Sequence, residues 1–334
     1  MNKNIVKTVI KVVLTFIFLY FISRKVKIED LYLLLKSISL QYVVILLTIN
    51  VIMVAISCLK WQIFLRATGT EIPVRTLMVY YYIGYFFNNL LPSSIGGDVA
   101  RMYLLGKNMN DHTKSISTVF LERYTGVIAL IALAIIAAAL NERIAFQPAF
   151  MIPLSIMALV LIGSLIFFSY DGIKIWIYDL FDFKFLASIK SKFDGFYQAV
   201  SHFRNQWKII GYSMLYSFAF HIMTIINTLA TCWALNISPG LFDLAVTVPI
   251  ILFVTMIPIT IGSIGLWEGT FAFFFLQIGI PPADAVAVAL ILRAVSILMG
   301  LLGGIFYLFR RQMLKHPPAP IMESGTKSIS SGTD

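Results

Sequence analysis

The chain has 334 residues, of which 59% are hydrophobic and 13% charged, against roughly a quarter charged in an average soluble domain. Its mean hydropathy of +0.86 is more than the interior of a soluble fold can hide, so the composition predicts an integral membrane protein. The net charge of +10 does not indicate a nucleic-acid partner, because the lysines and arginines stand in short flanks between apolar runs, where they orient helices and meet anionic lipid.

Six runs of the sequence are long and apolar enough for full transmembrane helices, which need about 20 such residues. The first run, 6–22, follows three lysines and lacks a small-residue cleavage signature, so we interpret it as a retained helix rather than a signal peptide. The other five are 40–59, 117–140, 150–168, 209–235 and 285–309.

Two further apolar regions, 76–105 and 242–280, are interrupted by proline and glycine. Proline removes a backbone donor and glycine loosens a helix, so each region should form two short helical arms around an irregular turn. Such backbone is tolerated at membrane depth only when protein packs around it or it lines a wet cavity. The sequence therefore predicts two broken re-entrant hairpins, with Pro92 and Gly96 in the first turn and Pro258, Gly262 and Gly265 in the second.

The distribution of lysine and arginine predicts both termini in the cytoplasm. With both hairpins re-entrant, the basic residues gather in the cytoplasmic loops, Lys60 among them, and the external loops near 141–149 and 235–243 carry only Arg143. The segment that holds Arg24, Lys25, Lys27 and Lys36 disagrees, because it would lie outside. We expect a multi-pass protein of the cytoplasmic (inner) cell membrane.

Three spans and one hairpin in each half would make an inverted repeat. We expect a single transmembrane domain over 1–309, with repeat halves near 1–140 and 150–309. The segment 170–208 interleaves aromatic and charged residues and is typical of amphipathic helices at the interface, while 310–334 should be a disordered cytoplasmic tail.

Charged residues within apolar runs cost about 2.5 to 3.5 kcal/mol each at mid-membrane, so those present need a partner or a function. Asp98 and Arg101 follow the first turn on one helical face. Either Asp98 caps the return arm and Arg101 reaches the inner interface, or Arg101 and the free donors of the arm bind an anionic headgroup, which Gly96 and Gly97 would let approach.

Glu268 and Arg293 have opposite charges in otherwise apolar helices, so we predict that they lie close together. They could be a structural ion pair or a site for a coupling proton or a headgroup. Glu122 and Arg123 point about 100° apart on one helix and cannot share one partner, so one of them should serve the cavity and the other the interface.

The sequence contains no arrangement typical of an enzyme or a metalloprotein. The four histidines have no spacing that places two on one helical face, and Cys58 and Cys232 are predicted to be small core residues. No Ser-His-Asp set, P-loop or paired-aspartate motif is found. We therefore expect no metal, no cofactor and no enzyme activity.

The segment from Asn88 and Asn89 through Pro92 and Gly96 to Arg101 resembles the signature of the lysylphosphatidylglycerol synthase transmembrane-region family, also called flippase-like or UPF0104 proteins. The likeness extends to Leu121-Glu122-Arg123, to 258–268 and to Arg293. In the multiple peptide resistance factor such a region is joined to a soluble aminoacyl-transferase domain, which these 334 residues do not contain. The resemblance therefore implies lipid handling rather than a synthase activity.

We expect a lipid flippase or transporter that moves an anionic or lipid-linked headgroup through a polar cavity between the two hairpins. Its partners would be membrane lipids, either phospholipid or polyprenyl-phosphate-linked. A membrane-embedded transferase and a scaffold for other membrane enzymes are the alternatives. The candidate substrate-binding residues flank the two turns or carry the intramembrane charges: Asn88, Asn89, Pro92, Gly96, Gly97, Asp98, Arg101, Glu122, Arg123, Pro258, Gly262, Gly265, Glu268 and Arg293.

Overall fold

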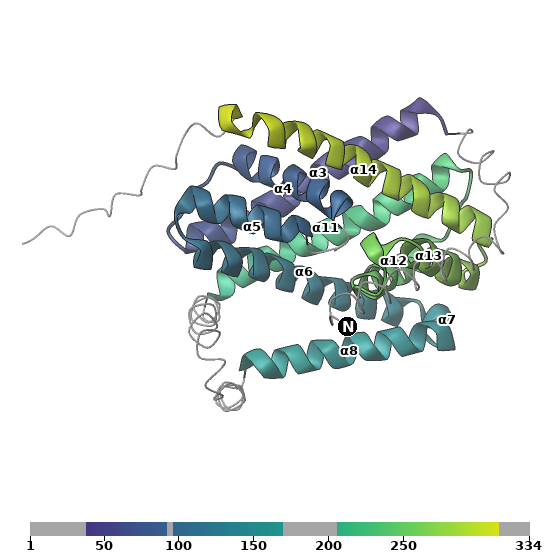
Figure 1. The fold of residues 1–334 in the computed structure, drawn as a ribbon. Helices are drawn as coiled ribbons and strands as arrows, with labels where there is room; N and C mark the ends of the chain where they lie inside the picture. The colour runs from purple at the N-terminus through teal and green to yellow at the C-terminus, as the bar shows by residue number, and fades with distance from the viewer. Residues whose placement is uncertain (1–37, 92–95, 170–205, 314–334) are drawn as a thin grey trace, which may run out of the picture.

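The computed structural model describes residues 38–91, 96–169 and 206–313, all of whose regular elements are helical (Figure 1). The expected span 6–22, most of the amphipathic segment 170–208 and the tail beyond residue 313 lie outside the described residues. The elements are α3 (Leu40–Ala67), α4 (Val74–Leu90), α5 (Gly96–Met109), α6 (His112–Leu140), α7 (Glu142–Ala145), α8 (Pro148–Ser169), α11 (Trp207–Ala234), α12 (Leu241–Thr255), the 3-10 turn Ile261–Ser263, α13 (Leu266–Gln277) and α14 (Pro282–Met313).

Four of the described helices, α3, α6, α11 and α14, are long and apolar enough to cross a membrane. Helix α8, with 22 residues, coincides with the expected span 150–168. Large apolar side chains such as Leu159, Leu301 and Leu308 are exposed on the outside of the bundle, as they are in a protein solvated by lipid. The chain is thus an all-helical multi-pass membrane protein.

Helix α3 continues well beyond the expected end of its span. We expected the span to end at residue 59 and Lys60 to lie in a cytoplasmic loop, but α3 runs to Ala67 and buries Lys60. The helix can hold this cation because the Nζ of Lys60 lies 3.1 Å from a carboxylate oxygen of Glu122. A prediction from apolar runs ends the helix at the first charged residue. In the structure the helix continues, because Glu122 supplies a counter-charge for Lys60.

Each interrupted region is two short helices, as the prolines and glycines predict: α4 and α5 in the first, α12 and α13 in the second. At 12 to 17 residues, they are about 18 to 25 Å long, less than the ~30 Å hydrocarbon core. Helices α4 and α5 pack against each other, as do α12 and α13. The pairs occupy opposite ends of the bundle, on the left and on the right in Figure 1.

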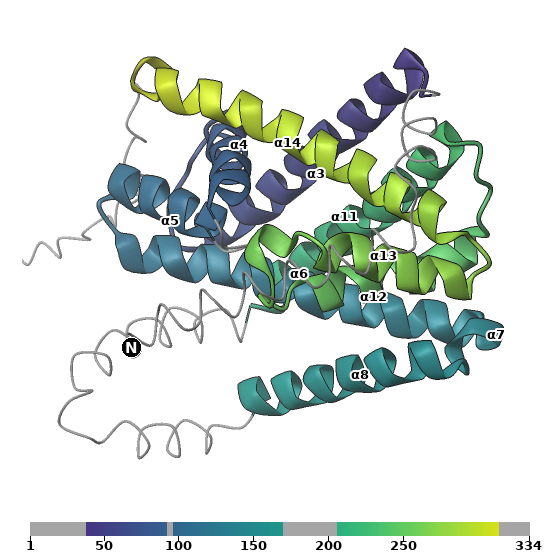
Figure 2. The same cartoon turned by 45° about the vertical axis from the view of Figure 1, so that its right-hand side comes forward.

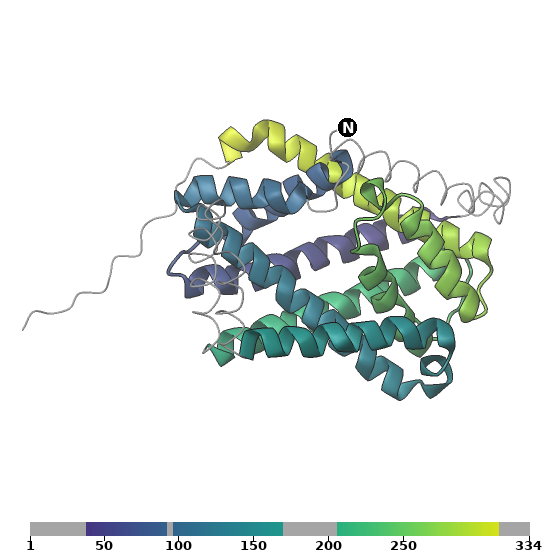
Figure 3. The same cartoon turned by 60° about the horizontal axis from the view of Figure 1, so that its bottom comes forward.

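The packing of the two pairs follows one pattern. Helix α4 packs along α14, whereas α12 packs along α6, and α3 packs against α11 between them (Figure 2). The contact of α4 with α14 is close because α14 presents small residues: a Cβ at Gly303 would collide with the backbone carbonyl of Tyr82. Helix α8 lies at the edge of the bundle, against α6 (Figure 3).

Candidate functional site

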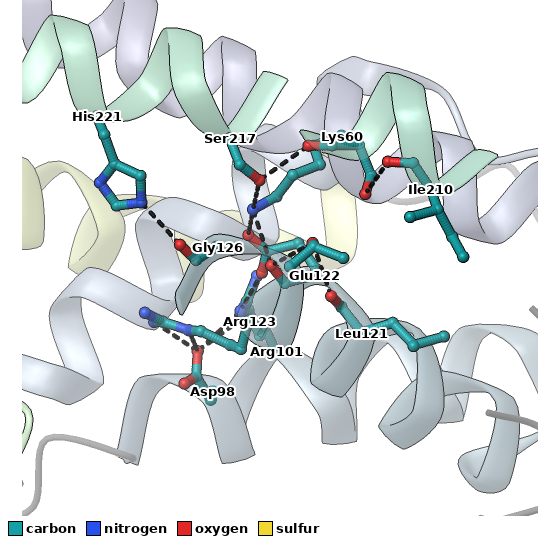
Figure 4. A network of polar contacts seen from close by, with 12 residues as sticks. Lys60, Asp98, Arg101, Leu121, Glu122, Arg123, Gly126, Ile210, Ser217 and His221 are labelled. Carbon is teal, nitrogen blue, oxygen red and sulfur yellow. Dashed lines mark hydrogen bonds and ion pairs between the residues drawn. The ribbon is translucent and has the colours of Figure 1, made fainter. Parts of the chain in front are cut away.

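A network of ion pairs joins α3, α5 and α6 inside the bundle (Figure 4). Its centre is Arg101, which is 1% exposed. The Nη2 of Arg101 lies 2.7 Å from a carboxylate oxygen of Glu122 and 2.9 Å from Oδ1 of Asp98, to which its Nε also donates. Arg123 donates to the same Asp98 oxygen at 2.9 Å. The two carboxylates therefore hold three helices together.

Lys60 completes this network from the α3 side. Its ammonium contacts Glu122, donates to the Glu122 backbone carbonyl at 2.8 Å and to the hydroxyl of Ser217 on α11 at 3.2 Å. The guanidinium of Arg101 also lies over the rings of Trp61 and Tyr81, 5.1 and 4.5 Å from their centroids, where cation–π attraction adds to the ion pairs. Three cations against two carboxylates leave one formal positive charge, and the half-exposed Arg123 is the accessible cation.

The local sequence explains how α5 reaches this position. Gly97 approaches α4 so closely that a Cβ there would collide with the backbone carbonyl of Gly84. The backbone N–H of Gly97 donates to Oδ1 of Asn88 at 2.7 Å, so a side chain near the end of α4 satisfies a free donor in the first turn of α5. The glycine pair thus sets the helix spacing that brings Asp98 and Arg101 to α6.

A second ion pair lies at the other hairpin, and it confirms that Glu268 and Arg293 are close together. The Nε of Arg293 lies 2.7 Å from Oε1 of Glu268. The other Glu268 oxygen accepts from the backbone N–H of Gly265 at 2.8 Å, and Gly265 is the N-cap residue directly before α13, with φ 78° in a conformation that favours glycine. Arg293 also donates to the carbonyls of Gly262 and Ser263, at 3.3 and 3.2 Å, and so fixes the turn before α13.

The two hairpins border one cavity of about 310 Å³. The end of α4 contributes Tyr85, Asn88 and Asn89, and the second turn contributes Gly262 and Ser263. The remaining polar lining comes from the long helices α3, α11 and α14, and consists of Asn50, Thr224, Asn227, Thr228, Arg293 and Ser296. A cavity with a mixed lining, polar on the side of these residues and apolar along α12 and α13, therefore lies where the first arm of one hairpin meets the turn of the other.

The structure divides the candidate residues among different positions. Asn88, Asn89, Gly262 and Arg293 line the cavity, and Glu268 and Gly265 support Arg293. Gly96 and Gly97 begin α5, Pro258 is exposed in the second turn, and Pro92 lies outside the described residues. The other four form the ion network: Asp98, Arg101, Glu122 and Arg123.

Arg101, Glu122 and Arg123 differ in their burial and in their partners. Arg101 does not extend to the membrane surface, because its side chain is buried between two carboxylates and two aromatic rings. Glu122 is buried and pairs with Lys60 and Arg101, whereas the half-exposed Arg123 pairs with Asp98, so they have separate partners, as their helical spacing predicts. Neither residue lines the cavity, where one of the two was expected. Cys58 and Cys232 are buried and free.

Sequence reasoning found Asn88 and Asn89 but missed the uncharged polar residues that α3 and α11 contribute to the cavity. It considered only ionisable groups within the apolar spans, whereas Asn50 on α3 and Thr224, Asn227 and Thr228 on α11 supply much of the polar lining. Asparagine inside a membrane-length apolar segment is the signal that could have found Asn50 and Asn227, since its amide also needs partners there.

Comparison with known proteins agrees with this architecture. The profile of a family described as the lysylphosphatidylglycerol synthase TM region matches residues 8–304. A UPF0104 membrane protein of Pyrococcus horikoshii is 25% identical, covering 93% of this chain and 98% of the relative. Another, from Methanocaldococcus jannaschii, is 24% identical over 90% of this chain and 93% of the relative. No solved structure matches significantly. Because the profile spans nearly the whole chain, this protein belongs to the lysylphosphatidylglycerol synthase transmembrane-region family.

Proposed function

We propose that this protein is a lipid transporter that moves the polar headgroup of a membrane lipid across the bilayer while the tails stay in the lipid phase. The observation that carries the proposal is the cavity bordered by both hairpins, because asparagine, threonine and serine side chains line part of it. A headgroup needs hydrogen-bonding partners on its path, since each polar group left unsatisfied in hydrocarbon costs several kcal/mol, on the order of 2 to 7. The ends of α4 and the turn before α13 supply such partners.

We propose further that the chain is an inverted repeat. In this arrangement α3 corresponds to α11, α4 and α5 to α12 and α13, and α6 to α14. The packing supports it, because α4 lies along α14 while α12 lies along α6, and α3 packs against α11. A two-fold axis in the membrane plane would exchange these contacts, and it would let one half move against the other around a central site.

The two ion pairs support the repeat independently. Asp98 lies two positions after the first residue of α5, and Glu268 lies two positions after the first residue of α13. Arg123 lies eleven positions after the first residue of α6, and Arg293 eleven positions after that of α14. Each carboxylate contacts its arginine, at 2.9 and 2.7 Å. Equivalent acid–arginine pairs thus link the second arm of each hairpin to the following long helix.

A transporter also fits the cavity better than a transferase does. A transferase needs an acid or base that reaches its substrate. The described lining contains no carboxylate and no histidine, and Asp98, Glu122 and Glu268 are all engaged by arginine or lysine. The cavity therefore offers binding groups rather than groups poised for proton transfer.

Reconstitution into vesicles tests the transport proposal directly. The purified protein should carry tail-labelled lipids between leaflets, so that a membrane-impermeant quencher reaches a larger fraction of label than in protein-free vesicles. Thermal unfolding of the same preparation establishes that the protein is folded. Folded protein that leaves the accessible fraction of every lipid class unchanged would contradict the proposal.

Cysteine labelling tests the predicted topology. Lys107 at the end of α5 and Ser238 between α11 and α12 are both exposed, and Cys58 and Cys232 are buried. We expect Lys107→Cys to react with an impermeant maleimide only from the cytoplasmic side and Ser238→Cys only from outside. The reason is that the first hairpin starts and finishes at one end of the bundle, and the second hairpin starts and finishes at the opposite end. Labelling of Lys107→Cys from outside alone would mean that the first hairpin crosses the membrane.

A further inference from the structure

We propose that the headgroup this cavity accepts is uncharged and rich in hydroxyl groups, of the size of a single glycosyl unit. This inference rests on the proposed function, because it takes the cavity as the headgroup site. It replaces the expectation of an anionic headgroup, and three properties of the lining carry it: its charge, its hydrogen-bonding groups and its size.

The charge of the cavity does not favour an ionic headgroup. Among the described lining residues, Arg293 is the only charged one, and its guanidinium is already neutralised by Glu268 at 2.7 Å and engaged by two backbone carbonyls. An anionic headgroup would have to compete with that carboxylate, and a cationic headgroup would meet no carboxylate in the lining. The net charge of Arg293 and its partner is zero, so a neutral ligand pays the smallest electrostatic penalty.

The asparagines provide donors and acceptors in equal number. The Nδ2 of Asn50 donates to the backbone carbonyl of Leu46 at 2.9 Å and also to Asn227. The Nδ2 of Asn89 donates to the backbone carbonyl of Ser296 at 3.0 Å. Asn88 and Asn227 use Oδ1 to accept, from the Gly97 N–H and from Asn50. Among the described residues, these bonds leave two amide oxygens and two amide nitrogens for a ligand.

This balance suits hydroxyl groups, each of which donates one hydrogen bond and accepts others. A phosphate monoanion or a carboxylate chiefly takes donors, and an ammonium group takes only acceptors, so either would leave half of the amide groups unpaired. The hydroxyl oxygens of Thr224 and Thr228 add two acceptors, because their hydrogens are already donated to backbone carbonyls of α11 at 2.9 and 3.0 Å.

The size of the cavity favours a compact headgroup. Its 310 Å³ lies at the lower end of the ~300 to 1,000 Å³ typical of ligand pockets. One sugar ring or a glycerol group fits within such a space.

A competition experiment tests the headgroup class. The protein is placed in nanodiscs with equal amounts of monoglucosyl-diacylglycerol, phosphatidylglycerol and lysylphosphatidylglycerol, and the lipids retained after purification are quantified by mass spectrometry. We expect the glucosyl lipid to be enriched over both charged lipids. Retention in proportion to the input, or enrichment of a charged lipid, would overturn the inference. A hexose on polyprenyl phosphate is a fourth competitor, and its preferential retention would show that the site needs the phosphate.

Two conservative variants connect the preference to the cavity. Thr224→Val/Thr228→Val keeps the side-chain shape and removes two acceptors, so the enrichment of the glucosyl lipid should fall about tenfold. Thr48→Val is the matched control, because Thr48 also donates to its own helix, at 2.8 Å to Val44, but is exposed outside the cavity. Equal enrichment in the double variant and in the control would overturn the inference. Retention without translocation would leave it standing and contradict the transport proposal alone.

Discussion

Replacing Glu122 with alanine is expected to lower the free energy of unfolding by about 3 to 5 kcal/mol, the usual cost of removing one partner from a buried ion pair. Glu122 alone contacts both Lys60 and Arg101, at 3.1 and 2.7 Å, and all three side chains are almost fully buried. Its loss leaves Lys60 with only a backbone carbonyl and the Ser217 hydroxyl. Thermal unfolding in detergent micelles should therefore show a large drop in Tm.

A double variant and a surface control make this expectation specific. Lys60→Met/Glu122→Ala removes the stranded cation together with the carboxylate, so it should regain part of the lost stability, and a double-mutant cycle should show coupling. Lys114→Ala breaks an exposed pair, in which Nζ lies 3.8 Å from Asp111, and should change stability by no more than about 1 kcal/mol. If Glu122→Ala and Lys114→Ala gave equal losses, the network would not be a stabilising one.

The same network changes what an Arg101 variant is expected to do. If Arg101 contacted only a headgroup, as the sequence suggests, the Arg101→Ala variant would be expected to fold normally. In the structure Arg101 lies between Asp98, Glu122 and two rings, so truncation leaves two carboxylates undercompensated and opens a cavity between α3 and α5. A role of Arg101 in headgroup binding remains a prediction, and its test needs the milder Arg101→Lys change.

The parts of the fold that depend on local chemistry could be predicted from the sequence. The sequence clusters of proline and glycine at 92–97 and 258–265 follow the ends of α4 and α12, as predicted, whereas the single Pro249 lies inside α12. The proximity of Glu268 and Arg293 followed from the cost of an unpaired charge in an apolar interior, since few opposite charges were available. The burial of Lys60 was not predicted, because Lys60 follows directly after an apolar run, where a lysine ordinarily marks the end of a helix.

The part of the cavity lining that comes from α3 and α11 could not be predicted, because it depends on long-range contacts. Asn50 and Asn227 are 177 positions apart in the sequence, and their amides meet at 3.3 Å only because α3 packs along α11. Neither residue carries a charge whose cost demands a partner, so the sequence gives no reason to pair them.

Replacing Arg293 with lysine is expected to lower the initial rate of lipid translocation about tenfold or more while the protein stays folded. Lysine can keep the contact with Glu268, but a single ammonium cannot also reach both carbonyls of the second turn, at Gly262 and Ser263. The turn borders the cavity, so its loosening should disturb the headgroup site before it unfolds the helices. Vesicle translocation and thermal unfolding, measured on one preparation, separate the two effects.

Exchanging the two charges distinguishes a simple ion pair from this wider role. Glu268→Gln removes the negative charge of the pair and should lower both stability and transport. If the pair only holds α13 to α14, the exchanged variant Glu268→Arg/Arg293→Glu should regain much of what Glu268→Gln loses. The geometry predicts that it does not, because a glutamate at 293 would face the carbonyls of Gly262 and Ser263, and an arginine at 268 cannot accept from the Gly265 N–H. Full transport by the exchanged variant would show that opposite charge alone is sufficient, and the turn would then have no part in transport.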